Sequence, residues 1–154
     1  MARLCFETPF GPMALEGEEA LTRLWLPGSL PDGWGRGEET LLLRAARQQL
    51  LDYFAGARRD FDLPLAAAGT DFQRAVWDAL RSIPYGQTRT YGEIAAAIGR
   101  PRAVRAVGQA NHVNPLPIFI PCHRVVGKSG TLTGYAGGLD LKGALLALES
   151  GKER

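Results

Sequence analysis

Short apolar runs alternate with turn-forming residues in the first part of the chain. Apolar positions at 4–6, 13–15 and 21–26 are separated by segments rich in glycine, proline and charged residues. Short runs bounded by such turn signals are typical of antiparallel strands. We therefore expect a β-meander over residues 3–27, followed by a loop at residues 28–37 that is rich in glycine and proline.

A helical repeat follows the meander. Apolar residues recur at helical spacing between residues 39 and 54, which predicts one amphipathic helix there. Residues 60–65 are a candidate for one further strand, and the small residues at 65–69 predict a linker. We place a domain boundary after residue 65, so that residues 1–65 form a small α/β structural domain and residues 66–154 form a second domain.

The second domain is expected to be mainly helical. Two segments have the spacing of a capping box, in which a Thr and the Gln or Glu three residues later each cap a backbone amide at a helix start; these pairs are Thr70 with Gln73 and Thr90 with Glu93. The first pair opens a helix with an apolar stripe over residues 72–83 that ends at Pro84. The second opens a short alanine-rich helix that runs to Ile98 and stops at Gly99, a residue type favoured just after helix ends.

A third helix is expected to begin near Pro101, which suits a first helical turn, and to run to about Asn111. Two short helices joined by a brief link are typical of a helix-turn-helix. The third helix combines two arginines with small residues that would allow close approach to a narrow groove: Arg102, Ala103, Arg105, Ala106, Gly108 and Ala110. Tight packing of this helix inside the protein is the alternative explanation of the small residues.

The remaining residues predict one irregular segment, one loop and one helix. Prolines at 115, 117 and 121 predict that residues 116–126 are extended and irregular rather than a sheet strand, because proline cannot donate to a ladder. A glycine-rich loop is expected at residues 127–138 and a closing helix at residues 139–150. The predicted fold is α+β, with a β-meander and one helix in the first domain and a helix-turn-helix in the second.

Charge is distributed unevenly, although the 154 residues carry a net charge of only +2. Residues 1–70 hold 7 basic and 10 acidic residues, residues 71–154 hold 11 and 6, and the window 74–128 holds 8 and 2. A basic second half indicates a polyanionic partner such as nucleic acid. A solvated face that is basic by chance is the alternative.

Composition narrows the class of protein. With 45% hydrophobic and 22% charged residues, the chain is typical of globular proteins rather than disordered or fibrous ones. No apolar run approaches the roughly 18 residues of a membrane span, and the N-terminal residues lack the pattern of a signal peptide, so we expect a cytoplasmic protein that contacts no membrane. The two Cys and two His lack metal-ligand spacing, which predicts no metal site; no cofactor is expected either.

Cys122 is the strongest candidate for chemistry. A lone Cys is usually an inert buried residue, but this one lies on a proline-bounded irregular segment, precedes His123, and belongs to a basic region that favours the thiolate. Adjacent residues of an extended segment point to opposite sides, so His123 would need a bridging water or a bend to reach the sulfur. An acid must orient the imidazole, and the candidates after Cys122 are Asp140, Glu149 and Glu153, of which Glu149 adjoins packed positions of the last helix.

These residues lie in a segment that resembles the O6-alkylguanine-DNA alkyltransferase family. The family's active-site signature is matched by Pro121-Cys122-His123-Arg124-Val125. The similarity covers about the last 80 residues in order, and further matching positions include Tyr91, the run from Arg102 to Gly108, Asn114-Pro115, Tyr135, Lys142 and Glu149. The first 65 or so residues fit the family's N-terminal domain only in length and pattern.

The resemblance implies a DNA repair protein that moves an alkyl group from the O6 atom of guanine irreversibly to its own Cys122, once per molecule. In that scheme His123 acts through a water and is oriented by Glu149. Asn114 holds the loop near the site, and Tyr91 donates a hydrogen bond to the departing guanine. The protein is expected to act as a monomer on double-stranded DNA.

The resemblance also implies how the lesion is recognised. The backbone carbonyls of Cys122 and Val125 would read the exocyclic amine, and the base would be covered by a loop of Tyr135, Ala136 and Gly137 that offers an N–H to O6. Arg105 would enter the duplex in place of the extruded nucleotide, while small residues fit the minor groove. The full set expected to contact DNA is Arg102, Ala103, Arg105, Ala106, Gly108 and Arg124.

The sequence departs from some members of the family at two points. Two other functions are also considered. Some relatives have a hydroxyl residue where Ala136 stands, and some hold a zinc ion in the N-terminal domain, where Cys5 is here the only Cys or His. One rival is a helix-turn-helix DNA-binding protein with a non-reactive Cys122. The other is a cysteine hydrolase that uses Cys122 and His123. No regulatory domain is expected before residue 1.

Overall fold

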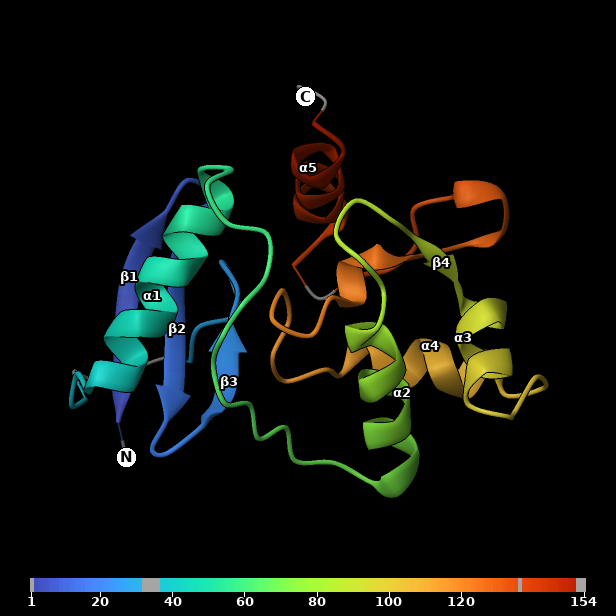
Figure 1. The fold of residues 1–154 in the computed structure, drawn as a ribbon, viewed down its shortest axis with the longest axis horizontal. Helices are drawn as coiled ribbons and strands as arrows, with labels where there is room; N and C mark the ends of the chain where they lie inside the picture. The colour runs from blue at the N-terminus through green and yellow to red at the C-terminus, as the bar shows by residue number, and fades with distance from the viewer. Residues whose placement is uncertain (1, 32–36, 136, 152–154) are drawn as a thin grey trace. The chain divides into compact units, whose positions relative to one another are not determined.

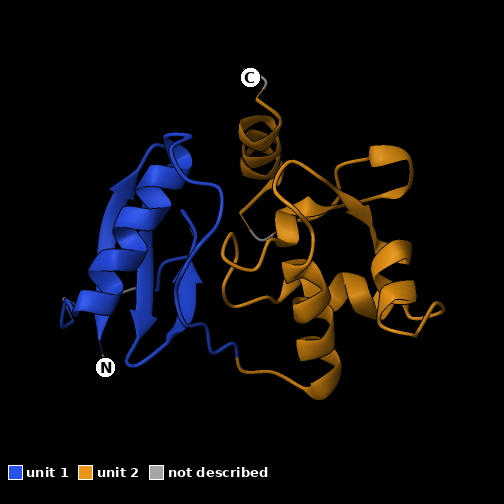
Figure 2. Ribbon diagram, in the orientation of Figure 1, with its two compact units in different colours: residues 1–67 blue, residues 68–154 orange. Residues whose placement is uncertain are grey.

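The computed structural model describes residues 2–31, 37–135 and 137–151, and it divides the chain into two compact units, residues 1–67 and residues 68–154 (Figure 2). The division falls two residues beyond the boundary expected after residue 65. Within the described ranges, no helix is long and apolar enough to cross a membrane.

The first unit is built on a three-stranded antiparallel sheet of β1 (Arg3–Thr8), β2 (Gly11–Gly17) and β3 (Leu21–Trp25), in the order β1-β2-β3. The helix α1 (Leu41–Phe54) lies across one face of β1 and β2 (Figure 1). Thr40 caps the helix start by accepting a hydrogen bond from the backbone N–H of Leu43. The predicted meander and the helix are therefore confirmed.

The core of this unit lies between the sheet and α1. The buried side chains of this unit include Leu43, Ala46, Leu50 and Tyr53 from the helix and Met13, Ala14 and Leu15 from β2. The strand expected at residues 60–65 does not form. Residue 65 makes only an isolated bridge to Leu21, whose backbone bonds to Pro64 and Ala66. Pro64 has no N–H to offer a neighbouring strand, which limits the pairing to this single contact.

The second unit contains three helices that pack on one another, α2 (Asp71–Arg81), α3 (Tyr91–Ala97) and α4 (Val104–His112) (Figure 1). Both predicted capping boxes are present, with Thr70 and Gln73 at α2 and Thr90 and Glu93 at α3. The indole N–H of Trp77 on α2 donates to the carbonyl of Ala110 on α4 at 2.9 Å in the interior. This bond fixes α4 against the core of the unit.

The third predicted helix begins later than expected. Residues 101 and 102 form a turn, closed by a hydrogen bond from the N–H of Ala103 to the carbonyl of Arg100 at 2.9 Å, and α4 starts at Val104. Ala103 has φ −89° and ψ 30°, a backbone conformation outside the helical region. Pro101 therefore lies in the link between the two helices rather than in a first helical turn.

The irregular segment before the last helix also differs in part from the prediction. Cys122–Arg124 form a short 3-10 turn, η1, and Val125–Val126 form a strand, β5, that pairs in parallel with β4 (Arg89–Thr90). The expectation of no sheet strand is wrong for these two residues, because the prolines precede them and leave their N–H groups free to pair. A second 3-10 turn, η2 (Lys128–Gly130), leads towards α5 (Leu139–Ser150), which matches the predicted closing helix and packs against η1.

Candidate active site

Cys122 begins the tight turn η1 and is buried, with 2% of its surface exposed. Its N–H donates to the carbonyl of Ile120 at 2.7 Å, and the N–H of Arg124 donates to the carbonyl of Pro121 at 3.0 Å. The premise that Cys122 and His123 lie on an extended segment is therefore wrong: the chain bends at this point. The turn fixes where the sulfur sits.

Glu149 on α5 holds the imidazole of His123. The distance from His123 Nε2 to Glu149 Oε2 is 2.7 Å, and both side chains are buried. An ionised carboxylate can only accept, so Nε2 carries the proton and Nδ1 keeps a lone pair. His123 Nδ1 is buried and has no hydrogen-bond partner in the described part of the structure. Of the three acids considered from the sequence, the structure brings Glu149 to the histidine.

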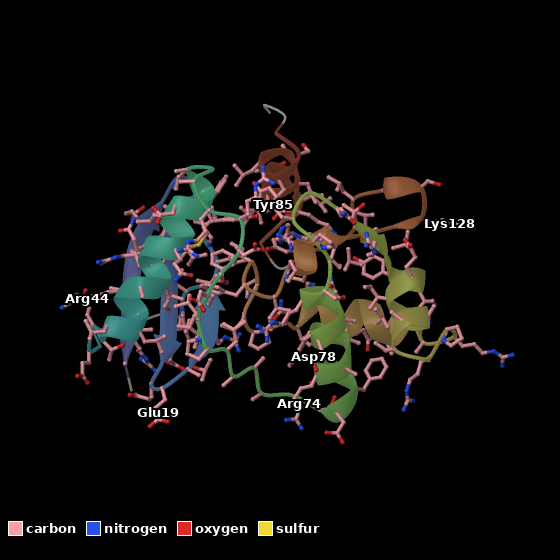
Figure 3. The ribbon with its side chains drawn as sticks, viewed as in Figure 1. Glu19, Arg44, Arg74, Asp78, Tyr85 and Lys128 are labelled. Carbon is pink, nitrogen blue, oxygen red and sulfur yellow. The ribbon has the colours of Figure 1, made fainter. Side chains whose placement is uncertain are left out.

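Arg124 lies in the interior and not on a surface. Its Nε donates to Glu149 Oε1 at 2.7 Å, Nη2 donates to Oε2 at 2.9 Å, and Nη1 donates to the carbonyl of Ile83 at 2.7 Å. Its guanidinium also lies over the ring of Tyr85, which Figure 3 shows beside α5. The expected contact of Arg124 with DNA does not fit this placement, because all three nitrogens are engaged inside the protein. Its position within the signature gave no indication of burial.

The charges around His123 oppose one another. Burial lowers the pKa of His123, since the cation loses its hydration, and Glu149 acts in the opposite direction by hydrogen bonding and charge. The positive charges of Arg124 and Lys142 lower the pKa further. The balance lowers the pKa, so His123 is a neutral imidazole whose free Nδ1 can accept a proton.

Burial also raises the pKa of the Cys122 thiol. Hydrogen bonding from Asn114, the charge of Lys142 and hydrogen bonding from Tyr135 act in the opposite direction but do not outweigh burial. The positive charge of Lys142 thus favours the thiolate, as expected, but burial outweighs it and favours the protonated thiol.

Lys142 is a functional candidate to which the sequence reading gave no role. It is fully buried, and its Nζ donates to the carbonyl of Val125 at 2.6 Å and to the carbonyl of Thr133 at 3.2 Å. The pKa of Lys142 is lowered by burial, while the negative charge that Cys122 acquires on ionisation raises it. A lysine is rarely buried unless it has partners. From the sequence alone, a lysine two helical turns before the end of α5 is therefore expected at the surface.

Two asparagines tie the segment around Cys122 to its surroundings. Asn114 Nδ2 donates to the carbonyl of Ile120 at 2.9 Å, and its Oδ1 accepts from the N–H of Leu116 at 3.0 Å, which closes the loop before the turn η1. Asn111, on α4, donates from Nδ2 to the carbonyl of Cys122 itself at 3.3 Å. Asn111 was read from the sequence only as the end of a helix. No pattern of side chains in the sequence indicated this contact.

Some of the residues expected around the base lie near the turn η1. Tyr91, at the start of α3, shares a hydrogen bond of 2.6 Å with the hydroxyl of Thr133, and Tyr135 is buried. Thr133 also offers its carbonyl to Lys142, so Tyr91 is connected through Thr133 to the residues around Cys122. Gly137 lies in a turn before α5. Ala136 lies outside the described residues.

A groove of about 700 Å³ runs along the outer face of α4. Arg105, Ala106 and Gly108 line it, together with Tyr91 and Thr133. Arg102 is exposed and Ala103 half-buried at the start of α4, but neither lines the groove. Among the described residues Cys122 does not line it either, but Tyr91 and Thr133 do, and Thr133 is hydrogen-bonded to Lys142.

Two small residues of α4, Ala106 and Gly108, line this groove and are not required by packing in the interior. Ala106 is exposed, and a Cβ added at Gly108 would make only ordinary contact with Tyr91, at 3.9 Å. The protein interior therefore does not require a glycine at 108. Tight internal packing accounts for Ala110, which is buried, but not for these two positions.

Fold and site together define a helical domain with a buried cysteine, a neighbouring histidine held by a carboxylate, and a groove lined by small residues and an arginine. The described residues contain no group of three or more His, Cys, Asp or Glu that could hold a metal ion. A sequence profile described as "6-O-methylguanine DNA methyltransferase, DNA binding domain" matches residues 71–151. The chain belongs to the O6-methylguanine DNA methyltransferase family.

Two relatives and one solved structure are similar to this chain over nearly its whole length. A methylated-DNA–protein-cysteine methyltransferase of Methanosarcina acetivorans is 53% identical over 94% of this chain and 95% of its own. The constitutive enzyme of that name from Bacillus subtilis is 52% identical over 93% and 92%. The crystal structure of Mycobacterium tuberculosis OGT in complex with DNA has a TM-score of 0.89 at 48% identity, covering 98% of this chain and 94% of that one. The predicted α+β fold is therefore confirmed in both units.

Proposed function

We propose that this protein repairs DNA by transferring the alkyl group of O6-alkylguanine, typically a methyl group, to Sγ of Cys122. The observation that carries the proposal is the buried cysteine followed by a histidine whose Nε2 is held by Glu149, in a chain of this family. The bond between O6 and the alkyl carbon breaks, and a bond between Sγ and that carbon forms. The thioether has no ready leaving group, so each molecule reacts once.

The proton of the thiol leaves through His123. A water between Sγ and His123 Nδ1 would pass the proton to the lone pair, and Glu149 would stabilise the resulting cation. The free Nδ1 supports this route. The departing guanine takes up one proton as the bond to oxygen breaks. Tyr91, whose hydroxyl shares a hydrogen bond with Thr133, would donate a hydrogen bond to the guanine as it leaves.

Recognition of the base is assigned to backbone groups near Cys122. The carbonyls of Cys122 and Val125 would accept from the exocyclic amine of guanine. The loop with Tyr135, Ala136 and Gly137 would cover the base. A thiol that is only 2% exposed must gain access to the base when the lesion binds. The loop would therefore open to admit the base and close over it.

DNA would lie along the groove of α4. Its small residues allow the helix to enter the minor groove, and the target base must leave the duplex because O6 is inaccessible in a stacked pair. Arg105 would fill the space of the flipped nucleotide, with Arg102, Ala103, Ala106 and Gly108 near the backbone. The crystal structure of the Mycobacterium tuberculosis protein with DNA supports DNA as the partner. The protein would act in the cytoplasm as a monomer.

One observation favours a second candidate function. The burial and raised pKa of Cys122 also suit a DNA-binding protein with an inert cysteine. Intact mass after incubation with a duplex containing O6-methylguanine separates the two. We expect one added methyl group per molecule, located on the Cys122 peptide and missing in Cys122→Ala. An unmodified wild-type protein that still binds the duplex would support the inert alternative, and repeated turnover would indicate a hydrolase.

A further inference from the structure

The helix α4 presents two faces with different contacts. Arg105, Ala106 and Gln109 line the groove, whereas Val107 and Asn111 are buried and do not line it. Asn111 is 3% exposed, and its Nδ2 donates to the carbonyl oxygen of Cys122 at 3.3 Å. One hydrogen bond thus joins the helix that lines the groove to the backbone of the reactive residue.

The orientation of the Asn111 amide follows from its partner. A carbonyl oxygen can only accept, so the nitrogen and not the oxygen of the amide must face Cys122. Asn111 Oδ1 is then left buried without a hydrogen-bond partner in the described part of the structure. An unmade hydrogen bond at a buried acceptor is destabilising, and an apolar residue of similar shape avoids it. Asn111 therefore donates a hydrogen bond to the carbonyl of Cys122 even though its own buried Oδ1 lowers the stability of the protein.

We propose that Asn111 is a positioning residue that holds the carbonyl oxygen of Cys122 in place to accept a hydrogen bond from the exocyclic amine of O6-alkylguanine. This inference rests on the proposed function and names one determinant of its selectivity. The carbonyl oxygen has two lone pairs, so it can accept from Asn111 and from the base together. The second carbonyl assigned to the amine, that of Val125, is held in the same way by Lys142 at 2.6 Å. Both acceptors are thus fixed by a buried donor.

Asn111 can be tested without changing any charge beside the sulfur, unlike Lys142. The probes are two duplexes that differ only in the exocyclic amine, one with O6-methylguanine and one with O6-methylhypoxanthine, which lacks it. Single-turnover rates of methyl transfer are measured for wild type, Asn111→Leu and Asn111→Ser. Asn111→Ser removes the same amide with a smaller side chain, so the test does not depend on one variant folding. Gln48→Leu is the matched control, an amide-to-leucine change at an exposed position of α1 in the other unit.

The ratio of the two rates, guanine over hypoxanthine, is the decisive quantity. We expect both Asn111 variants to lower it by about 5- to 10-fold, which equals roughly 1 to 1.4 kcal/mol at 1.36 kcal/mol per tenfold, while Gln48→Leu leaves the ratio unchanged. A merely structural defect slows both substrates alike, so an unchanged ratio in the Asn111 variants would overturn the proposal. A wild-type ratio near one would do the same. Transfer from neither substrate by the wild type would instead refute the proposed function.

Discussion

Replacement of Arg124 by Met should destabilise the second unit strongly. Arg124 makes two hydrogen bonds to Glu149, at 2.7 and 2.9 Å, and the side chains are 8% and 1% exposed. Because so little of the pair is in contact with water, screening by solvent does not reduce the effect. Removing one partner of a buried ion pair leaves an uncompensated charge, at about 3–5 kcal/mol. For a protein of this size that corresponds to a fall in Tm of about 6–20 °C.

The measurement is urea unfolding, followed by the fluorescence of Trp77 on α2. Trp25 and Trp34 belong to the other unit and are replaced by Phe in the background protein, so the signal reports on the second unit alone. Arg74→Met is the control, because Arg74 forms an exposed ion pair with Asp71 at 3.0 Å (Figure 3). Such surface pairs contribute little, so this variant should unfold with the background protein.

A second variant separates charge from packing. If the loss in Arg124→Met arises from the charge left on Glu149, then Arg124→Met with Glu149→Leu should be more stable than Arg124→Met alone, because both charges are removed together. A loss below about 1 kcal/mol in the single variant, the size of an ordinary hydrogen bond, would refute the reasoning. A double variant no more stable than Arg124→Met would show that packing, not charge, is responsible.

Four further outcomes follow from the site. The lowered pKa of His123 means that the unfolded state binds more protons below the ordinary His value of about 6.5; stability should be complete above that pH and fall as pH decreases below it, as urea titrations at several pH values can check, with His123→Gln flattening the decline. Exposed Cys5 should react with an aromatic disulfide reagent much faster than buried Cys122. Gly108→Ala should stabilise the protein by about 0.5–1 kcal/mol yet weaken DNA binding in a titration. Arg105→Ala should slow repair of a duplex but not reaction with the free base O6-benzylguanine, in parallel single-turnover assays.

Elements whose signals are local could be predicted from sequence. The two capping boxes need only residues three apart, and both form as expected at Thr70 and Thr90. The closing helix also matches residue for residue. The pairing of β4 with β5 could not be predicted, because it joins Arg89 to Val125 across two intervening helices and involves only two residues on each side. No periodicity is visible in so short a strand.

The site was predictable where a motif or a helical face gave a constraint. Helical spacing placed Glu149 beside buried positions but did not choose it among the three acids. The family resemblance did, and Glu149 does bind His123. Asn111 and Lys142 escaped notice for a common reason. Each is a polar residue that is buried because a backbone carbonyl needs its donor, at Cys122 and at Val125. A carbonyl's need for a partner has no signature in side-chain patterns.

Arg124 shows why a count of charges overstates the basic surface of this chain. The window 74–128 holds 8 basic and 2 acidic residues, and Arg124 is one of the eight. Its charge is compensated in the interior by Glu149, which lies outside the window. The exposed cations near the start of α4 are Arg100, Arg102 and Arg105. Because binding of DNA through phosphate contacts weakens with salt in proportion to their number, substitution of these arginines should reduce the salt dependence of binding, whereas changes at Arg124 should act on folding and on His123.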